Sequence, residues 1–182
     1  GLLTICNCDI LNNSGKGIYT NATGTTHIKN CIIRGNIAGN IDIETSSADI
    51  SYSNVEGGWN KVEGMLSPYW KKGNIDLDPL FTNANIGDYT ITKYSPCLDR
   101  GSLDTPPGSV DFNGATRVKN GVIDMGAFES DYFRDCNGNG APDGQETTGD
   151  CNGNHIPDSC EPNEKDAGTC PDCSFLDRCP CG

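Results

Sequence analysis

The chain has 182 residues, 35% of them hydrophobic, and a formal net charge of −12 at pH 7. This length suits one ordinary domain with an appendage, and the apolar content is sufficient for a buried core. The excess of carboxylates argues against nucleic acid as a partner, because phosphate contacts need Lys and Arg. The sequence has no continuous apolar run of about 18 residues, which predicts no membrane insertion.

The first third of the chain contains a repeat of 22 to 23 residues. The segments "ICNCDILNN", "IKNCIIRGN" and "ISYSNVEGG" superpose so that Ile5, Ile28 and Ile50 share one column. The same alignment gives three more columns, which are Cys8 with Cys31 and Ser53, Ile10 with Ile33 and Val55, and Ile18 with Ile41. Each unit has too few apolar residues to fold alone, so the units must stack to bury a core.

The stacked repeat predicts an all-β fold, a right-handed parallel β-helix (solenoid) with a β-rich C-terminal cap, followed by an irregular calcium- and disulfide-stabilised tail. Asn7 and Asn30 suit the unusual dihedral angles of a corner between strands, and Asn13 over Asn36 suits a hydrogen-bonded ladder. We divide the chain into parallel β-helix coils at 1–60, the cap region at 61–130, tandem calcium-binding loops at 131–162 and a Cys-rich tail at 163–182.

Four later segments carry a resemblance to a known family. The motifs "ISYSNVEGGW", "GNIDLDPLF", "GDYTITKYSPCLDRGS" and "VDFNGATRVKNGVIDMGAFE", in this order, resemble the C-terminal part of secreted bacterial parallel β-helix repeat proteins of the choice-of-anchor Q type. The resemblance implies this fold and secretion, and no particular activity. The family's recurring polar positions fall on Asp111, Asn113, Arg117, Asp124 and Glu129. We expect Arg117 to pair with Asp111 or Asp124 and so to fix the last turns of the cap; a ligand site is the alternative.

Two segments fifteen residues apart match the ligand spacing of a calcium-binding loop, with oxygen ligands at positions 1, 3, 5, 7, 9 and 12. The first loop supplies Asp135, Asn137, Asn139, Ala141 through its carbonyl, Asp143 and Glu146. The second loop supplies Asp150, Asn152, Asn154, Ile156 through its carbonyl, Asp158 and Glu161. The sequence therefore predicts that Ca²⁺ is a partner, with one ion in each loop.

Both loops depart from the EF-hand pattern. Pro142 and Pro157 lack the amide hydrogen that pairs EF-hand loops, and no amphipathic helix flanks either loop. The loops resemble the linear calcium repeats of dockerins and thrombospondin type 3 segments. Gly140 suits the sharp turn at position 6, whereas His155 at the same position must accept strain, so we expect the second site to be weaker. A transition-metal site at His155 is the alternative.

The eleven cysteines are unevenly distributed, and seven of them lie from Cys136 onward. This density in a segment with few apolar residues predicts disulfides and an oxidising, extracellular location. A four-thiolate zinc site in "CPDCSFLDRCPC" is the alternative. In the coils, we expect Cys8 over Cys31 to be two small buried thiols, with a disulfide as the other possibility.

These features favour an extracellular, calcium-binding structural or adhesion protein, attached to the cell surface or bound to its polysaccharide. Because a full coil begins within four residues of Gly1, we expect either missing upstream coils or head-to-tail stacking with another copy into a filament. The alternative is the C-terminal part of a secreted carbohydrate-active enzyme, a polysaccharide lyase or hydrolase. We expect no catalysis, since the charged residues of the coils form no evident catalytic cluster; they include Lys16, Arg34, Asp42 and Glu44.

Overall fold

The computed structural model describes residues 1–146, apart from 22, 45–46, 65–67 and 105–107. The chain divides into two compact units with the boundary between Tyr132 and Phe133. The described residues are rich in short strands, and their helices are single 3-10 turns, η1 (Gly58–Lys61), η2 (Ala84–Ile86) and η3 (Asp143–Gln145). In this described part, no helix has the length and apolar character needed to cross a membrane.

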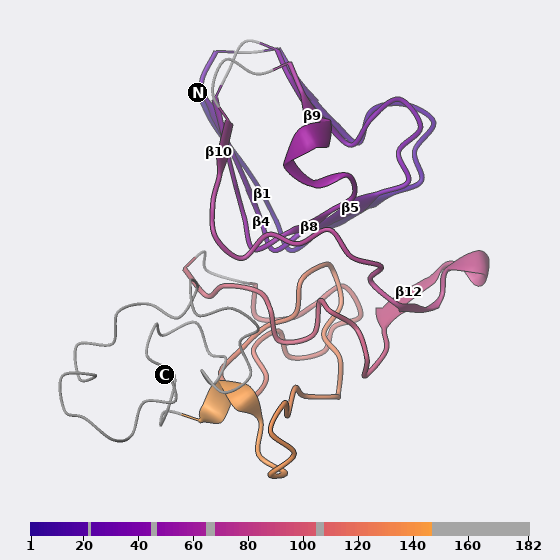
Figure 1. The fold of residues 1–182 in the computed structure, drawn as a ribbon, viewed down its shortest axis with the longest axis vertical. Coiled ribbons are helices and arrows are strands. Elements are labelled where there is room, and N and C mark those ends of the chain that lie inside the picture. Colours follow the sequence, from indigo (N-terminus) through magenta and orange to yellow (C-terminus); the bar gives the residue numbers. More distant parts are fainter. Residues whose placement is uncertain (22, 45–46, 65–67, 105–107, 147–182) are drawn as a thin grey trace, which may run out of the picture. The chain divides into compact units, whose positions relative to one another are not determined.

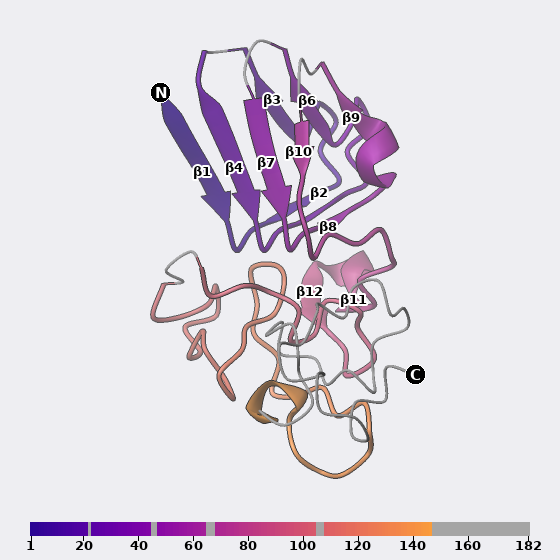
Figure 2. The same ribbon diagram turned by 60° about the vertical axis from the view of Figure 1, so that its left-hand side comes forward.

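The first unit is an all-β structure built on three parallel sheets. The largest sheet contains, in order, β1 (Leu2–Cys6), β4 (Thr25–Lys29), β7 (Ser47–Ser51) and β10 (Pro68–Trp70), as Figure 2 shows. The second sheet contains β2 (Asp9–Leu11), β5 (Ile32–Arg34) and β8 (Asn54–Val55), and the third β3 (Ile18–Thr20), β6 (Ile41–Ile43) and β9 (Val62–Glu63). The chain thus visits the three sheets in the same order on each successive pass.

The strand register confirms the columns read from the repeat. Ile5 pairs with Ile28, and Ile28 pairs in turn with Ile50. The other two apolar columns also form, with Ile10 beside Ile33 and then Val55, and Ile18 beside Ile41. In-register pairing lets identical branched side chains contact one another across neighbouring strands.

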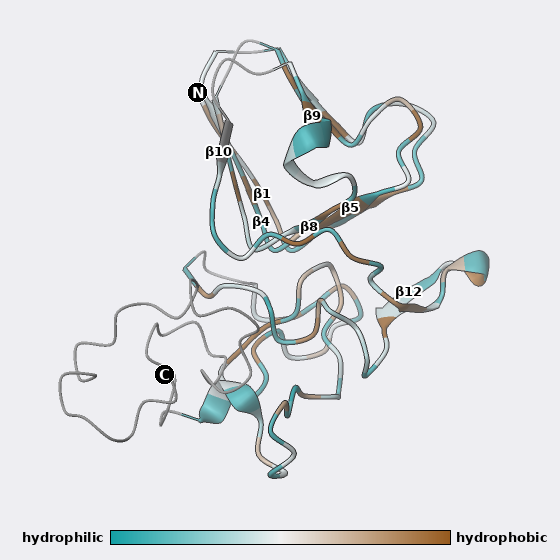
Figure 3. Ribbon diagram, viewed as in Figure 1, coloured by the Kyte–Doolittle hydropathy of each residue, from teal (hydrophilic) through white to brown (hydrophobic). Residues whose placement is uncertain are grey.

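These columns form the hydrophobic core of the coils. Ile28, Ile33, Ile41 and Ile50 are fully buried, and Trp70 of β10 packs against the same cluster. Burying one such side chain contributes roughly 1.5–3 kcal/mol relative to leaving it in water. Figure 3 shows the hydrophobic stretches of the strands, for example at β5, as brown segments between paler or teal turns.

The corner between the first two sheets has the same backbone conformation in each pass. Asn7, Asn30 and Tyr52 have positive φ angles of 52°, 55° and 48°. The expectation for the two asparagines is confirmed, whereas Tyr52 in this conformation was not foreseen. The predicted asparagine ladder is also confirmed, because the Asn13 side-chain amide donates to Asn36 Oδ1 at 2.8 Å.

The region after the coils contains less strand than the term β-rich implies. Within the predicted bounds 61–130, β9 and β10 belong to the parallel sheets; the other described strands are the antiparallel pair β11 (Phe81–Asn83) and β12 (Asp88–Ile91), and the rest is turns, η2 and isolated bridges. This region has a second hydrophobic core, which consists of the buried residues Ile32, Ile91, Cys97, Leu98 and Met125. Ile32 belongs to β5, so consecutive side chains of one strand serve different cores: Ile33 faces the coil interior and Ile32 faces the cap.

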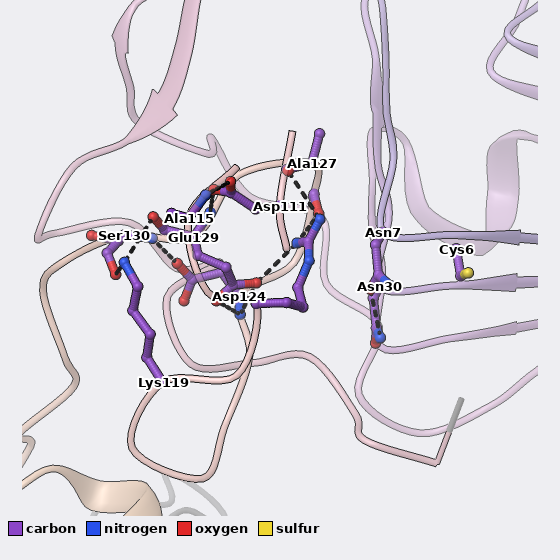
Figure 4. Close-up of polar contacts among 12 residues, drawn as sticks. Cys6, Asn7, Asn30, Asp111, Ala115, Lys119, Asp124, Ala127, Glu129 and Ser130 are labelled. Carbon is purple, nitrogen blue, oxygen red and sulfur yellow. Dashed lines mark hydrogen bonds and ion pairs between the residues drawn. The ribbon is translucent and has the colours of Figure 1, made fainter. Parts of the chain in front are cut away.

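Asn30 connects a coil corner to the cap. Its side chain is fully buried, donates to Ser102 O at 2.9 Å and to Asn7 Oδ1 at 3.1 Å, and accepts the Ser102 amide hydrogen at 2.8 Å. Figure 4 shows Asn7 and Asn30 stacked at this corner. A buried polar group left without its partner costs about 1–3 kcal/mol, so this contact stabilises both regions.

We predict that Asn30→Ala lowers the unfolding free energy by at least about 2 kcal/mol, because it removes the hydrogen bonds of the Ser102 backbone amide and carbonyl and places alanine at positive φ. Asn7→Ala serves as the matched control at the equivalent, less buried corner and should cost less than half as much. Urea denaturation followed by tryptophan fluorescence measures both values. Equal losses for the two variants would contradict the special role of Asn30.

Candidate functional site

The predicted first calcium loop is a tight turn organised by its own acidic and amide side chains. The Asp135 carboxylate accepts the amide hydrogens of Asn139 at 3.1 Å and Gly140 at 2.8 Å. Asn139 Oδ1 accepts the amide hydrogen of Ala141 at 2.8 Å. Gly140 has a φ angle of 84°, which confirms the expectation that a glycine is needed at position 6.

Glu146, at position 12, reaches back to the start of the loop. Its carboxylate accepts a hydrogen bond from the Asn137 side-chain amide at 3.0 Å and another from the Asn139 side-chain amide. The structure therefore brings the side chains of positions 3, 5 and 12 together, and it turns the position 1 carboxylate onto the backbone of positions 5 and 6. Glu146 would bind a calcium ion in place of these two amide donors.

Asp143, at position 9, is held differently from the other predicted ligands. It is fully buried, and one carboxylate oxygen accepts the Cys136 amide hydrogen at 2.9 Å. The other oxygen lies 3.3 Å from Arg134 Nε and has no hydrogen-bond partner. Arg134 was not among the residues expected from the sequence, although its position directly before Asp135 marks it as a counter-charge.

The donor set of the first loop fits calcium chemically. Three carboxylates, two amide oxygens and one backbone carbonyl lie within twelve residues, and calcium prefers hard oxygen ligands of this kind. The buried Asp143 oxygen without a hydrogen bond is an additional acceptor for a cation. Among the described residues, no three His, Cys, Asp or Glu side chains are gathered around a common point. In the loop, Asp143 faces Arg134, whereas Glu146 faces Asn137 and Asn139.

The second predicted loop lies outside the described residues, so its ligands and its lower affinity stay predictions; these ligands are Asp150, Asn152, Asn154, Ile156, Asp158 and Glu161. The tail disulfides and the alternative zinc site also stay predictions. Of the seven tail cysteines, all except Cys136 lie beyond residue 146, outside the described residues. The four free thiols of the described chain all lie in the first unit.

Arg117 forms a buried ion pair in the cap, but its partner is Glu129. Arg117 Nη1 lies 2.9 Å from Glu129 Oε1, and both side chains are almost completely buried, with exposures of 5% and 2%. The guanidinium also donates to the carbonyl oxygens of Gly126 at 3.1 Å and Ala127 at 3.0 Å. The expected pairing with Asp111 or Asp124 is therefore wrong, whereas the expected role of fixing the last turns fits these contacts.

Asp111 and Asp124 instead bind backbone amides of the same turns (Figure 4). Asp111 accepts amide hydrogens from Asn113, Ala115 and Glu129 at 2.8–2.9 Å. Asp124 accepts amide hydrogens from Asp99 and Ser130, both at 2.7 Å. Glu129 also accepts the Asp124 amide hydrogen, at 3.1 Å, while it pairs with Arg117, so all three carboxylates hold the backbone of this region.

Burial raises the pKa of three carboxyl groups of the first unit, which belong to Asp9, Asp124 and Glu129. Desolvation raises the pKa of Asp9 to about 7 and that of Asp124 to about 7. The pKa of Glu129 rises to about 8, first through desolvation and then through the nearby charge of Asp124, and the contact with Arg117 opposes this rise. These groups bond to the protein's own backbone and to Arg117, so we assign them a structural role.

The charged residues of the coils are engaged in surface pairs. Lys16 Nζ lies 2.8 Å from Asp42 Oδ2 and also contacts Glu63. Arg34 donates to the carbonyl oxygen of Leu77 at 2.9 Å, and Glu44 accepts from the Tyr19 hydroxyl at 2.9 Å. These contacts join different passes of the chain and give no arrangement of acid and base around an open position. They do not support catalysis by these residues.

Cys8 and Cys31 are free thiols, which confirms the expectation of two unlinked cysteines. Cys31 is fully buried, and Cys8 is half-buried. A hydrogen bond from the Cys31 thiol lowers the pKa of Cys8 to about 7 and raises the pKa of Cys31. Burial raises the pKa of the remaining core cysteine, Cys97, to about 11. Since the thiolate is the nucleophile, Cys8 is the reactive member of the pair.

We predict that iodoacetamide modifies Cys8 well before Cys31 or Cys97 in the native protein, because the thiolate fraction of Cys8 rises through pH 7. Peptide mass spectrometry at pH 6, 7 and 8 follows each site. Cys8→Ser should abolish this pH-dependent phase and leave the unfolded-state reactivity of the other thiols intact. Equal native rates at Cys8 and Cys31 would contradict the proposed asymmetry.

We predict that the first unit loses stability as pH rises from about 4 to about 7, in part through Asp9. Its raised pKa means that the folded state retains a proton that the unfolded state releases above about pH 4. Asp9→Asn keeps the oxygen that accepts the Ala127 amide hydrogen and removes this titration. The variant should therefore match the wild type at pH 4 and exceed it by at least about 1 kcal/mol at pH 8. Urea denaturation with chelator present tests this, and a difference independent of pH would contradict it.

Comparisons with known proteins assign no family to this chain. No protein-family model, no curated protein and no solved structure matches it. The resemblance of its motifs to secreted repeat proteins therefore stays a prediction, and a functional proposal has to be built on the residues of the chain itself.

Proposed function

We propose that this chain is a right-handed parallel β-helix repeat protein whose C-terminal loops bind calcium, and that it acts as an extracellular structural or adhesion protein. The observation that carries the proposal is the loop from Asp135 to Glu146, in which position 12 returns to positions 3 and 5 while position 1 caps the turn. The regular sheets of the first unit supply a stiff scaffold for such a role.

The solenoid reading rests on the way the strands pair. Each strand of the first two passes pairs in parallel with a strand 21 to 23 residues further along, and every pass meets the sheets in the same order. Parallel strands linked by connections of this kind are right-handed in nearly all proteins. Stacked passes bury a continuous apolar core at a constant cross-section, which suits mechanical stiffness more than a closed catalytic pocket.

Calcium would stabilise the acidic loop by neutralising charges that repel one another. The six predicted ligands of the first loop, Asp135, Asn137, Asn139, Ala141, Asp143 and Glu146, include three carboxylates and carry a combined charge of −3. A bound ion supplies a divalent positive charge at their centre and fixes both ends of the loop. Asp143 would exchange its contact with Arg134 for the ion, so Arg134 acts as a competing cation.

Calorimetric titration of the intact chain with calcium tests this proposal. We predict that Glu146→Gln removes one binding equivalent or weakens it at least tenfold, because glutamate at position 12 is the ligand that closes such loops. Asp131→Asn is the matched control, since Asp131 is exposed, lies just before the loop and pairs with Lys119. Arg134→Gln should bind calcium more tightly than the wild type, because Asp143 loses its competitor.

Proteolysis supplies the second measurement of the same prediction. With calcium present, cleavage between residues 133 and 146 should slow, and chelation should restore it, because only the folded loop binds the ion. An absence of binding heat in the wild type, or cleavage in this segment unaffected by chelator, would refute calcium binding. Retention of both equivalents in Glu146→Gln would show that the first loop is not a site.

A further inference from the structure

A polar groove lies on the outward face of the largest sheet. It has a volume of about 300 Å³, and besides Thr4 of β1 and Ile28 of β4 it is lined by six polar residues: His27, Lys29, Asp49, Ser51, Lys71 and Asp104. They come from β4, β7, the residue that follows β10 and one loop of the cap. All of these belong to the first unit.

The repeat itself places these side chains together. Successive side chains of a strand point to opposite faces. Along β4, Thr26 and Ile28 are buried, so the alternate residues His27 and Lys29 point outward. The parallel register then sets His27 beside Asp49, and Lys29 beside Ser51. Outward residues of adjacent strands, far apart in sequence, thus form a two-dimensional array of polar groups.

The charges within the groove cancel. Asp49 Oδ2 lies 3.0 Å from Lys71 Nζ and 3.5 Å from His27 Nδ1. Across the groove, Asp104 Oδ2 lies 3.6 Å from Lys29 Nζ. Two lysines and two aspartates give no net charge when the imidazole is neutral, and the whole chain carries −12. A polyanion would gain little electrostatic attraction from this neutral groove. A metal ion would be repelled by the ammonium groups of Lys29 and Lys71.

The ammonium donors and carboxylate acceptors of the groove suit a ligand with hydroxyl groups. A hydroxyl both donates and accepts, so it can bind an ammonium and a carboxylate at once, and adjacent hydroxyls can do so in series. Ile28 is the apolar residue of the lining, which leaves a peptide without the apolar anchors that usually fix one. The backbone groups of β4 and β7 already pair within the sheet, so an added strand finds no partner on this face.

The groove is also held in shape before any ligand arrives. Lys29 has a side-chain exposure of only 18%, and its ammonium lies 5.9 Å from the centre of the Tyr52 ring as well as near Asp104. Asp49 has an exposure of 21% and two basic neighbours. Side chains that are already ordered lose little further entropy on binding.

We propose that this groove on the outward face of β1, β4, β7 and β10 binds a neutral, hydroxyl-rich saccharide chain, with Asp49, Lys29 and Lys71 as its main hydrogen-bonding groups. The site is independent of calcium, because none of its residues belongs to the acidic loop. A saccharide chain lying on this face would attach the solenoid to a polysaccharide surface side-on.

A glycan microarray carrying both neutral and acidic glycans, probed with the labelled intact chain in EDTA, tests the proposal. We expect binding to neutral glycans. Against the best of these in solution, Asp49→Asn should weaken binding about tenfold, the effect of losing roughly one charge-assisted hydrogen bond. Asp42→Asn is the matched control, because Asp42 pairs with Lys16 at 2.8 Å on a strand of another sheet, and it should bind like the wild type.

Three outcomes would overturn the inference. The first is no binding to any neutral glycan. The second is binding to acidic glycans alone, which would indicate a simple attraction to the lysines. The third is equal weakening in Asp49→Asn and Asp42→Asn, with unchanged melting temperatures, which would place the ligand elsewhere. Lys71→Met supplies an independent check, since it should also weaken binding while leaving the coil core untouched.

Discussion

In-register stacking of isoleucine on isoleucine is the interaction on which the rest of the first unit depends. A single pass of the chain has too few apolar side chains to exclude water, and Ile28, Ile41 and Ile50 become fully buried only because neighbouring passes cover them. The same register also fixes which outward-facing residues lie side by side, such as His27 beside Asp49, and so it assembles most of the polar groove. Any one-residue slip would exchange the two faces of every strand.

The parallel strand pairing of the first unit could be predicted well from the sequence because its contacts repeat. Ile5, Ile28 and Ile50 recur at nearly constant spacing, and a constant spacing fixes both pairing and register. Asn7 and Asn30 could be placed at a corner because asparagine tolerates positive φ. Tyr52, in the same column, carries no such signal, and its conformation follows from the register of its neighbours.

The cap and the sites could be predicted less well because their contacts do not repeat. Arg117 had three acidic residues within reach along the sequence, and its pairing with Glu129 is set by the fold of these turns, which the spacing does not show. The spacing from Asp135 to Glu146 revealed a plausible ligand set but not the competing contact of Asp143 with Arg134. The groove also escaped prediction, because Asp104 joins it through the tertiary fold alone.

The hydrogen bonds between the first coils and the cap also affect how the chain folds as it is synthesised. Asn30 bonds with Ser102, 72 residues later, and Asp9 accepts from Ala127, 118 residues later. Strands that pair with their predecessors can assemble in order as the chain emerges, but these two contacts form only when the cap arrives. Contacts of such long sequence separation slow folding. The last residues of the unit therefore complete the hydrogen bonding of the first ones.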